Sequence, residues 1–457
     1  MTAALLCCAG CAHIDFGLLR AQQADAFRTE LEARTEAAVS EDEALTLDDC
    51  IAVALTNNLD VETAEITRRI AQLERKVAFA NFLPTLDLSV NYVSFDPQPE
   101  NKILGPLYTP IHDKTIRETV LQTELPIFVP ATWYLYAAHQ RGEEMAALAE
   151  DYVRQMISFQ VTGLYFHCVA LNHTAKALHS QLEAAQALEK EVRALYEEGM
   201  VLDWHAEQAA ALVLSRRIAL DKTRRAEQEA VADLLAAMGL SPLASLSLEL
   251  QMPLETPQSE LAGLAYEALL NHPRLKMADR QAAIAENKVK IALTEFLPKL
   301  FGFASRTNST NSFARYPDIT QMGLMGVLTL FDGLANVNEY RIARQEREKA
   351  YVAREQQSFS VLVSVVRAWL NLKNAEDDLS LADKSLAIAE ARLADTEAQW
   401  DEGLVNWSKR LEAVAERDRA EINVANARFQ QQVVIAGLRN ALGQTYMGAD
   451  EVDTNED

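Results

Sequence analysis

The chain is short of the residues that break helices: its 457 positions hold 16 glycines and 13 prolines. This scarcity favours long, uninterrupted elements. No run of about 18 or more apolar residues occurs, so the sequence offers no candidate for a transmembrane helix. Basic residues are outnumbered, 43 Lys and Arg against 66 Asp and Glu, for a formal net charge of −23. This balance argues against a nucleic-acid partner, whose phosphates require a basic surface.

Cysteine is also scarce, with five residues in all. A short apolar start ends in Cys8-Ala9-Gly10-Cys11, which resembles a bacterial lipoprotein cleavage site. Residues 1–11 are therefore expected to be a signal peptide with a lipobox, and Cys11 the lipidated residue. The alternative is a leader that stays uncleaved or that begins upstream of Met1. Cys50 and Cys168 lie on predicted helices without CxxC or metal-ligand spacing, and we expect them to be buried, inert thiols.

Residues with the spacing of an active site are missing too. His167, His173 and His179 are six positions apart, which places them on different faces of a helix. The sequence has no nucleophile and base pair, no phosphate loop and no supported pair of carboxylates. We therefore expect no enzyme, no cofactor and no metal site.

What the chain does contain is a duplication. Phe82-Leu83-Pro84 recurs as Phe296-Leu297-Pro298, a shift of 298 − 84 = 214 residues, and the match extends over some forty positions. A second shift of 403 − 199 = 204 pairs Tyr196-Glu197-Glu198-Gly199 with Trp400-Asp401-Glu402-Gly403. One structural unit is therefore present twice.

The Phe-Leu-Pro sequences mark where helical periodicity gives way to alternation. Proline cannot continue a helix, so helices are expected to end at Leu83 and Leu297. Strands are predicted at 86–95, 119–128, 300–307 and 320–331, joined by polar loops at 95–118 and 308–319. Phe301 and Phe303 share one face of the third strand, and Leu324, Leu328 and Leu330 share one face of the last.

Helices are predicted before and after these strands. Thr46 to Asp49 has the form of a capping box and opens a short helix that runs to about residue 56. Asn57 and Asn271 suit left-handed helix ends, and Pro273 suits a first helical turn. The following helices are expected over about 60–82 and 274–296.

The longest helices carry apolar or small residues at steps of three and four, a period of 3.5 that is typical of coiled coils. Gly199 and Gly403 end them, and return helices complete hairpins over 132–238 and 334–442. The predicted organisation is an N-terminal periplasmic segment at 12–46, repeat 1 at 47–242, a linker at 243–258, repeat 2 at 259–444 and an acidic tail at 445–457.

Four strands cannot close a barrel, whereas three chains supply twelve. The predicted fold is therefore mainly α with a small β part: a trimeric 12-stranded outer-membrane barrel, four strands per chain, continuous with a long α-helical barrel. The polar strand face would line water; it carries Asp87, Ser89, Asn91, Gln122 and Glu124.

The order of these patterns, twice over, resembles the outer membrane efflux protein family, that of TolC. The resemblance covers about 47–443. It implies a homotrimer in the outer membrane of a Gram-negative bacterium, with the α-helical barrel as a large periplasmic part, that docks a periplasmic membrane-fusion adaptor and an inner-membrane transporter, either proton-driven or ABC. The protein is further expected to contact outer-membrane lipid and, through Cys11, to be lipid-anchored.

In this family the hairpin turns close the periplasmic aperture and face the adaptor. The resemblance assigns this role to Glu197, Glu198, Gly199, Asp203, Asp401, Glu402, Gly403 and Glu412, and the helix-to-strand junctions to Phe82, Pro84, Phe296 and Pro298. A solvated acidic helix end is the alternative for each acid. His205 and Lys409 stand where acids are often seen, and Val405 where a gating arginine can occur, so the bonding network at the turns is expected to differ.

The function that this implies is the exit duct of a tripartite efflux system for small toxic compounds. The alternative is the outer-membrane component of a type I protein secretion system. A soluble coiled-coil scaffold is the third possibility, because helices of period 3.5 alone would permit it. The net charge also motivates the hypothesis of an acidic lumen that favours cations.

Overall fold

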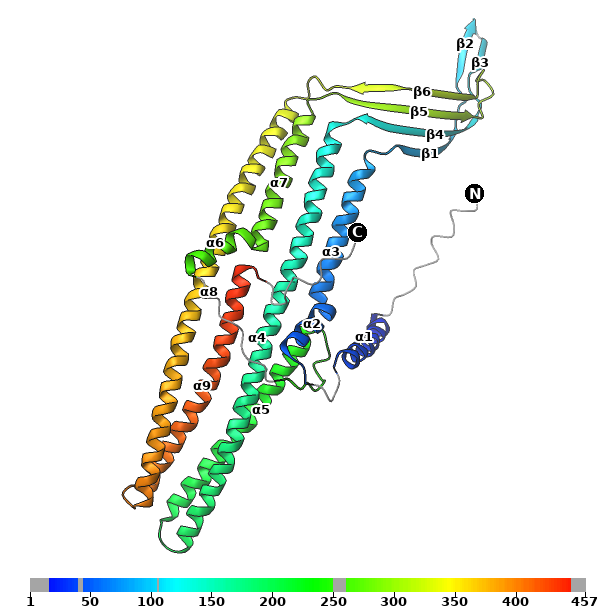
Figure 1. Ribbon diagram of the computed structural model, residues 1–457. Helices are drawn as coiled ribbons and strands as arrows, with labels where there is room; N and C mark the ends of the chain where they lie inside the picture. The colour runs from blue at the N-terminus through cyan, green and yellow to red at the C-terminus, as the bar shows by residue number, and fades with distance from the viewer. Residues whose placement is uncertain (1–15, 40–43, 105–106, 250–259, 445–457) are drawn as a thin grey trace. The chain divides into compact units, whose positions relative to one another are not determined.

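A computed structural model describes residues 16–39, 44–104, 107–249 and 260–444 (Figure 1). Cys11 and the acidic tail at 445–457 lie outside these ranges, as does most of the expected linker. The described residues are mostly helical with a small sheet part, which confirms the predicted balance of α and β structure. No helix among them is both long and apolar enough to cross a bilayer.

The helices are α1 (Phe16–Ala38), α2 (Leu47–Asn57), α3 (Leu59–Ala80), α4 (Pro130–Glu197), α5 (Asp203–Ala237), α6 (Leu261–Asn271), α7 (Pro273–Thr294), α8 (Ala335–Asp401) and α9 (Trp407–Leu442). The strands are β1 (Thr85–Ser94), β2 (Glu100–Leu104), β3 (Leu107–Pro110), β4 (Thr115–Phe128), β5 (Lys299–Ser309) and β6 (Asp318–Val327). They fall into two compact units. The first comprises 1–63, 151–272 and 360–457, and the second 64–150 and 273–359.

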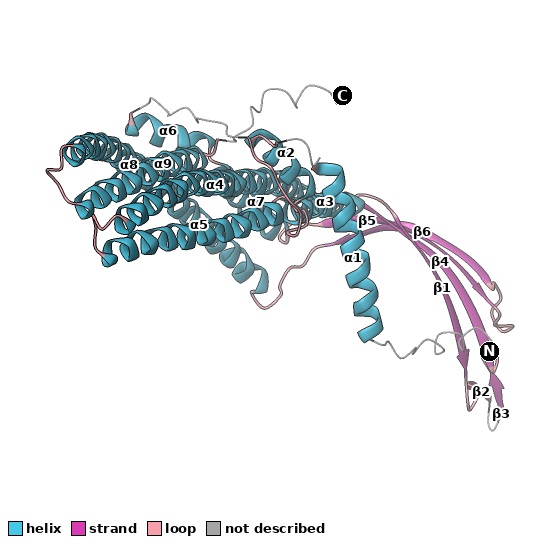
Figure 2. Ribbon diagram, turned by 90° about the horizontal axis from the view of Figure 1, so that it is seen from below, coloured by secondary structure: helices cyan, strands magenta, loops and turns pink. Residues whose placement is uncertain are grey.

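The second unit holds an antiparallel sheet of four strands in the order β1-β4-β5-β6 (Figure 2). Thr85 to Ser94 of β1 pair with Glu124 to Thr115 of β4, and β5 pairs with β4 on one side and β6 on the other. β1 and β6 each have one partner, so each leaves one edge of the sheet open.

The helices of this unit follow the same order as the strands that they join. Arg75 of α3 forms an ion pair with Glu143 of α4 at 2.9 Å. Glu144 of α4 pairs with Arg280 of α7 at 2.6 Å, and Glu286 of α7 pairs with Arg347 of α8 at 3.4 Å. The order α3-α4-α7-α8 matches β1-β4-β5-β6 because each strand continues directly from, or into, its helix. The unit is therefore one row of helices running into one row of strands, with α3 and α8 at its ends.

The first unit holds the two helical hairpins, formed by α4 from residue 151 on with α5 and by α8 from residue 360 on with α9. The seam residues of α4 are buried or half-buried, with Val161 and Cys168 at 0% and 2% exposure. Ala175, Leu178 and Leu220 form a core cluster between α4 and α5. The coiled-coil period thus marks the packed face. Cys50 and Cys168 are free and buried, as predicted, and burial raises the pKa of both thiols to about 12, which disfavours the reactive thiolate.

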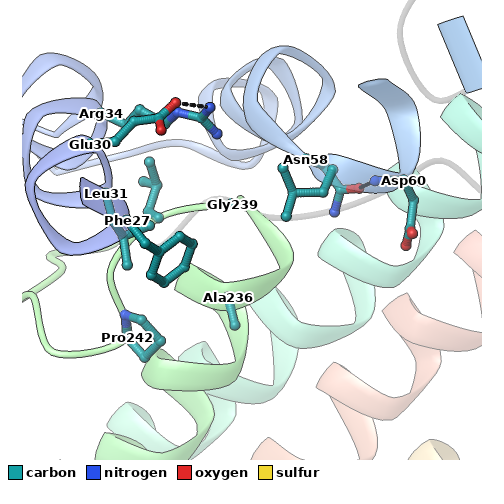
Figure 3. A pocket seen from close by; sticks show the side chains of 11 residues that line it. Phe27, Glu30, Leu31, Arg34, Asn58, Asp60, Ala236, Gly239 and Pro242 are labelled. Atoms are coloured by element: carbon teal, nitrogen blue, oxygen red, sulfur yellow. Dashed lines mark hydrogen bonds and ion pairs between the residues drawn. The ribbon is translucent and has the colours of Figure 1, made fainter. Parts of the chain in front are cut away.

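A pocket of about 610 Å³ lies in this unit between α1, the start of α3, and the end of α5 with the residues that follow it (Figure 3). Phe27 and Leu31 of α1 line one side and Ala236, Leu240 and Pro242 the other. Thr35 fixes the end of α1 by accepting a hydrogen bond at 2.9 Å from the Ser241 N–H. The N-terminal segment expected at 12–46 therefore consists largely of one helix. The sequence pattern did not predict the pocket.

Several boundaries differ from the prediction. Helices α3 and α7 end at Ala80 and Thr294, because the three residues before each proline form a tight turn rather than a last helical turn. The 95–118 segment is not a plain loop: β2 and β3 pair within it as a small hairpin. β6 ends at Val327, so Leu328 and Leu330 lie beyond the sheet.

The prediction of left-handed asparagines was wrong. The helix C-caps are Asn58 and His272, both with extended backbone at φ −71° and −60°. The following helix begins at once, and the Asn58 side chain accepts a hydrogen bond from the Asp60 N–H at 2.8 Å. Because its backbone is extended, Asn58 can end α2 and also cap the start of α3. The predicted capping box at Thr46 and Pro273 at the start of α7 are confirmed.

Candidate functional site

The two hairpin turns have the same backbone. Gly199 and Gly403 have φ of +74° and +71°, the left-handed region that favours glycine. Each glycine N–H bonds to the carbonyl three residues earlier, and the next N–H bonds five residues back, from Met200 to Leu195 and from Leu404 to Gln399. This pair of bonds is the Schellman motif. The duplication is therefore preserved down to individual hydrogen bonds.

The acidic residues assigned to the turns are all exposed: Glu197, Glu198, Asp203, Asp401, Glu402 and Glu412. Glu412 differs from the others because it lies inside α9 rather than at the turn. Within the described ranges the carboxylate of none of the six forms a hydrogen bond or an ion pair, whereas the main-chain N–H groups of Glu198 and Glu402 still bond within their helix ends. The structure thus gathers the acids of each turn at a helix end open to solvent.

Two of the three residues that depart from the family pattern, His205 and Lys409, take part in capping, whereas Val405 is half-buried just before α9. The Leu202 N–H donates to Nδ1 of His205 at 3.2 Å at the start of α5. At the start of α9 the side chain of Asn406 accepts from the Lys409 N–H at 3.1 Å. Since Asn406 caps by itself, Lys409 takes part through its backbone alone. At the starts of α5 and α9, His205 and Lys409 therefore take part in capping hydrogen bonds.

An aromatic cluster near the second turn joins the two hairpins. Trp407 is 3% exposed and packs in one core with Leu188, Val192, Ala209 and Leu411. The Arg410 guanidinium lies over the rings of Trp400 and Trp407, 5.8 and 5.7 Å from their centroids, and 3.5 Å from a Glu191 oxygen on α4. Helix α9 is thereby held against α4 and α5 by apolar and ionic contacts, whereas the cation–π contacts of Arg410 lie within the second hairpin.

Farther along α9, Asp418 forms a second link between the hairpins. Its carboxylate is 3% exposed and lies 3.1 Å from Nη2 of Arg216 on α5, with Arg417 at 3.2 Å. Gln181 on α4 donates to the Asp418 main-chain carbonyl at 3.4 Å. Burial raises the pKa of Asp418, and the nearby Arg417 and Arg216 offset only part of that effect. Periodicity had marked none of these residues.

The sheet has one apolar and one more polar face. Residues that pair directly across strands point to the same side, so Leu86, Leu88, Val90 and Tyr92 share a face with Leu121 and Leu125. All six side chains are exposed, between 42% and 71%. The opposite face carries Asp87, Ser89, Asn91, Gln122 and Glu124. Such a sheet has an apolar surface for lipid and a polar surface for water.

Phe301 and Phe303 lie on the polar face rather than with the apolar residues. Phe303 pairs with Glu124, and Leu324 pairs with Gly302 on the other side of the sheet. The reason is register: alternation within β5 shows which residues share a face, but only pairing with β4 shows which face that is.

The helix-to-strand junctions are tight turns followed at once by strands. Phe82 contacts Phe79 and Tyr136 with ring centroids 5.8 and 6.3 Å apart. Phe296 is 43% exposed and has no ring contact with any described residue. Pro84 and Pro298 each stand one residue before a strand. Within the described part of the chain, aromatic packing thus stabilises the junction at Phe82 but not the junction at Phe296.

Comparison with known proteins gives the chain a family. The model of the family described as outer membrane efflux protein matches residues 50–240 and 264–444. Protein CyaE of Bordetella pertussis is 25% identical over 250 residues, which are 53% of this chain and 52% of CyaE. The chain therefore matches about half the length of that curated relative.

Solved structures share the fold. The outer membrane protein VceC of Vibrio cholerae aligns with a TM-score of 0.73 and 18% identity over 88% of this chain and 96% of VceC. The outer membrane channel CmeC of Campylobacter jejuni aligns with a TM-score of 0.73 and 17% identity over 87% of this chain and 85% of CmeC. The family consists of channels, which removes the scaffold alternative and agrees with a non-enzymatic role. Because the two matched segments cover both copies of the duplicated unit, the chain belongs to the outer membrane efflux protein family.

Proposed function

We propose that three copies of this chain form the exit duct of a tripartite efflux system, which passes small toxic compounds from an inner-membrane pump to the outside. The observation that carries the proposal is the four-stranded sheet with open edges at β1 and β6 and one exposed apolar face. An unpaired strand edge in hydrocarbon costs several kcal/mol for each unsatisfied backbone group, about the cost of burying an unpaired amide. Pairing β6 of one copy with β1 of the next removes both edges, and three copies give twelve strands.

The ends of the helix row support the same assembly. On α3, Ile66, Ile70, Leu73 and Val77 recur at steps of four and three and are 46–68% exposed. On α8, Ile342, Val352 and Phe359 are 54–70% exposed. A stripe with coiled-coil spacing that stays exposed among the described residues of its own chain is suited to a neighbouring copy. The two stripes lie on the helices that end the row, as β1 and β6 end the sheet.

The hairpin turns would form the periplasmic aperture and the contact with the adaptor. Beside the exposed acids, Met200, Leu202, Trp204 and Leu404 are 53–71% exposed. Apolar side chains rimmed by charge are typical of a protein interface. We assign Gly199 and Gly403 to the reversal of the chain and the surrounding acids to the aperture.

The proposed location is the outer membrane of a Gram-negative bacterium, with the helical part in the periplasm. Lipidation of Cys11 would add an anchor beside the barrel. Mass spectrometry of the purified protein tests this part separately: an N-terminal cysteine at position 11 with attached lipid is expected, and an unmodified terminus would contradict it.

The test of the main proposal is membrane fractionation of the full-length protein, followed by sizing in mild detergent. We expect recovery from the outer membrane as a trimer. A species that extracts in salt buffer without detergent would overturn the proposal.

Deletion of the gene then separates the two transport roles. For the exit duct we expect cells to accumulate a fluorescent toxic dye and to regain efflux on complementation. Unchanged dye accumulation with loss of one secreted protein from the medium would favour type I secretion instead.

A further inference from the structure

An aromatic side chain lies on the side of the sheet that would face water. Phe303 on β5 pairs directly with Glu124 on β4 and with Gly323 on β6, so these three residues share one face. Asp87, Gln122 and Ser305 form the next row on that face. The glycines give independent evidence for the two faces. A Cβ at Gly302 would meet Ile127 and Leu125 on the apolar side, whereas one at Gly323 would meet Phe303.

The ring of Phe303 is held against the backbone of β6. A Cβ at Gly323 would lie 3.0 Å from both Cε1 and Cζ of the ring, tighter than most real Cβ contacts, so the ring would have to shift to admit it. The absence of a side chain at Gly323 therefore lets the ring lie close to the strand. Phe303 nevertheless remains 37% exposed. An aromatic ring of fixed position and open surface is unusual on a polar face, where alternation would place a hydrophilic residue.

Next to the ring is a carboxylate with no partner among the described residues. Glu124 is half-buried, and its carboxylate makes no hydrogen bond or ion pair within them. Directly opposed residues of neighbouring strands have Cβ atoms about 4.5–5.5 Å apart, so one small molecule could contact both side chains. Asp87 adds a second negative charge in the next row.

We propose that Phe303 and Glu124, with Gly323 as the positioning residue, form a binding station for aromatic organic cations on the inner wall of the channel. This inference rests on the proposed function, because it requires the polar face to line a lumen. The ring offers stacking and a cation–π contact, and the carboxylate offers charge complementarity. A neutral polar solute gains neither, and an anion is repelled by both carboxylates. Three copies would place three equal stations around the lumen.

The test uses the full-length protein in planar bilayers and tetraphenylphosphonium, an aromatic cation, as the probe. Tetrabutylammonium carries the same charge without rings and serves as the comparison. We expect tetraphenylphosphonium to reduce the current at lower concentration than tetrabutylammonium. Phe303→Leu should raise its half-blocking concentration about 2- to 30-fold, the range of a cation–π contact. The half-blocking concentration of tetrabutylammonium should change much less.

Three further variants separate the parts of the station. Glu124→Gln should weaken the block by both cations, because it removes charge. Glu118→Gln is the matched control, since Glu118 lies on the same strand and face but pairs with Ser309 and has no aromatic neighbour. Gly323→Ala keeps the ring and the carboxylate but forces the ring to move, so it should weaken the block by tetraphenylphosphonium alone.

The outcomes separate the inference from the proposed function. A wild-type trimer that conducts while Phe303→Leu leaves the block unchanged would overturn the station and leave the duct intact. Equal effects of Glu124→Gln and Glu118→Gln would also overturn it, since they would show only a general acidic lumen. A wild-type protein that forms no pores would overturn the proposed function and the station together.

Discussion

The turn of the first hairpin and the turn of the second share a backbone but not an environment. Both have a left-handed glycine and the same pair of Schellman hydrogen bonds. With the shift of 407 − 203 = 204 residues, however, Trp407 corresponds to Asp203, and one is buried whereas the other is exposed. Likewise Asp418 corresponds to Leu214, by 418 − 214 = 204: the second copy buries a charge where the first exposes 56% of a leucine.

This contrast separates what is local from what is not. A turn of this type depends on one glycine and the bonds of its neighbours, so both copies kept it. The burial of side chains beyond the turn depends instead on which helix packs against them. The second hairpin contacts the first through Trp407, Arg410 and Asp418, whereas the first presents Trp204 and Leu214 to the outside of the chain. The copies have therefore diverged in side chains and kept their backbone.

The largest expected effect comes from the buried tryptophan. Trp407→Ala should lower the free energy of unfolding by about 3–5 kcal/mol, because it leaves a cavity between the hairpins. Trp204→Ala is the matched control and should cost less than about 1 kcal/mol, since that side chain is 53% exposed. Urea titration followed by circular dichroism of the purified protein measures both. Equal costs would mean that the hairpins do not pack through Trp407.

The next largest effect is expected at the buried charge. Asp418→Ala should cost about 3 kcal/mol, because it leaves Arg216 largely buried without its partner. Leu214→Ala at the corresponding position should cost under about 1 kcal/mol. The same urea titrations check this pair. A larger loss for Leu214→Ala would reverse the assignment of the packed and the open hairpin.

Local chemistry made much of this fold predictable. The Phe-Leu-Pro junctions, the seam of α4 and the glycine turns all follow from rules that act within one or two turns of chain. The β2–β3 hairpin was missed because its short, proline-flanked strands do not alternate. The polar-face position of Phe303 and the Trp407 and Asp418 contacts were missed because register and helix partners depend on residues about 180 or more positions away.

The stability of the protein is expected to depend on pH through the buried carboxylate of Asp418. The pKa of Asp418 is raised in the folded protein, so between that value and the ordinary value of 3.8 the folded state binds a proton that the unfolded chain releases. The contribution of Asp418 to the free energy of unfolding therefore rises as the pH falls through this window. Relative to Asp418→Asn, the wild-type protein should gain stability from pH 7 to pH 4. A constant difference across urea titrations at these pH values would exclude the raised pKa.

The glycines test the part of the comparison that the two turns share. Gly199→Ala and Gly403→Ala should each cost about 1–2 kcal/mol, the strain of a left-handed residue that has a Cβ. Neither position has an atom within 4 Å of the added Cβ, so backbone strain is the whole cost and should be equal in both copies. Thermal unfolding of the two variants side by side measures this. A clear inequality would show that one turn is shaped by contacts rather than by its own sequence.

The smallest expected difference lies in the helix starts. Asn406→Ala should cost about 1 kcal/mol, because it removes an N-cap side chain that accepts from the Lys409 N–H and leaves that N–H only its bond to the Asn406 carbonyl. His205→Ala should cost only a few tenths, since the Leu202 N–H that donates to its ring is at an exposed site and can bond to water instead. The rates of amide hydrogen exchange at Leu202 and Lys409 measure how well each capping hydrogen bond protects its N–H. Faster exchange at Lys409 in Asn406→Ala, beside a small change at Leu202 in His205→Ala, would mean that the second turn is the more firmly capped. Equal changes would mean that His205 does for the first helix what Asn406 does for the second, and that the copies differ only in what packs beyond their turns.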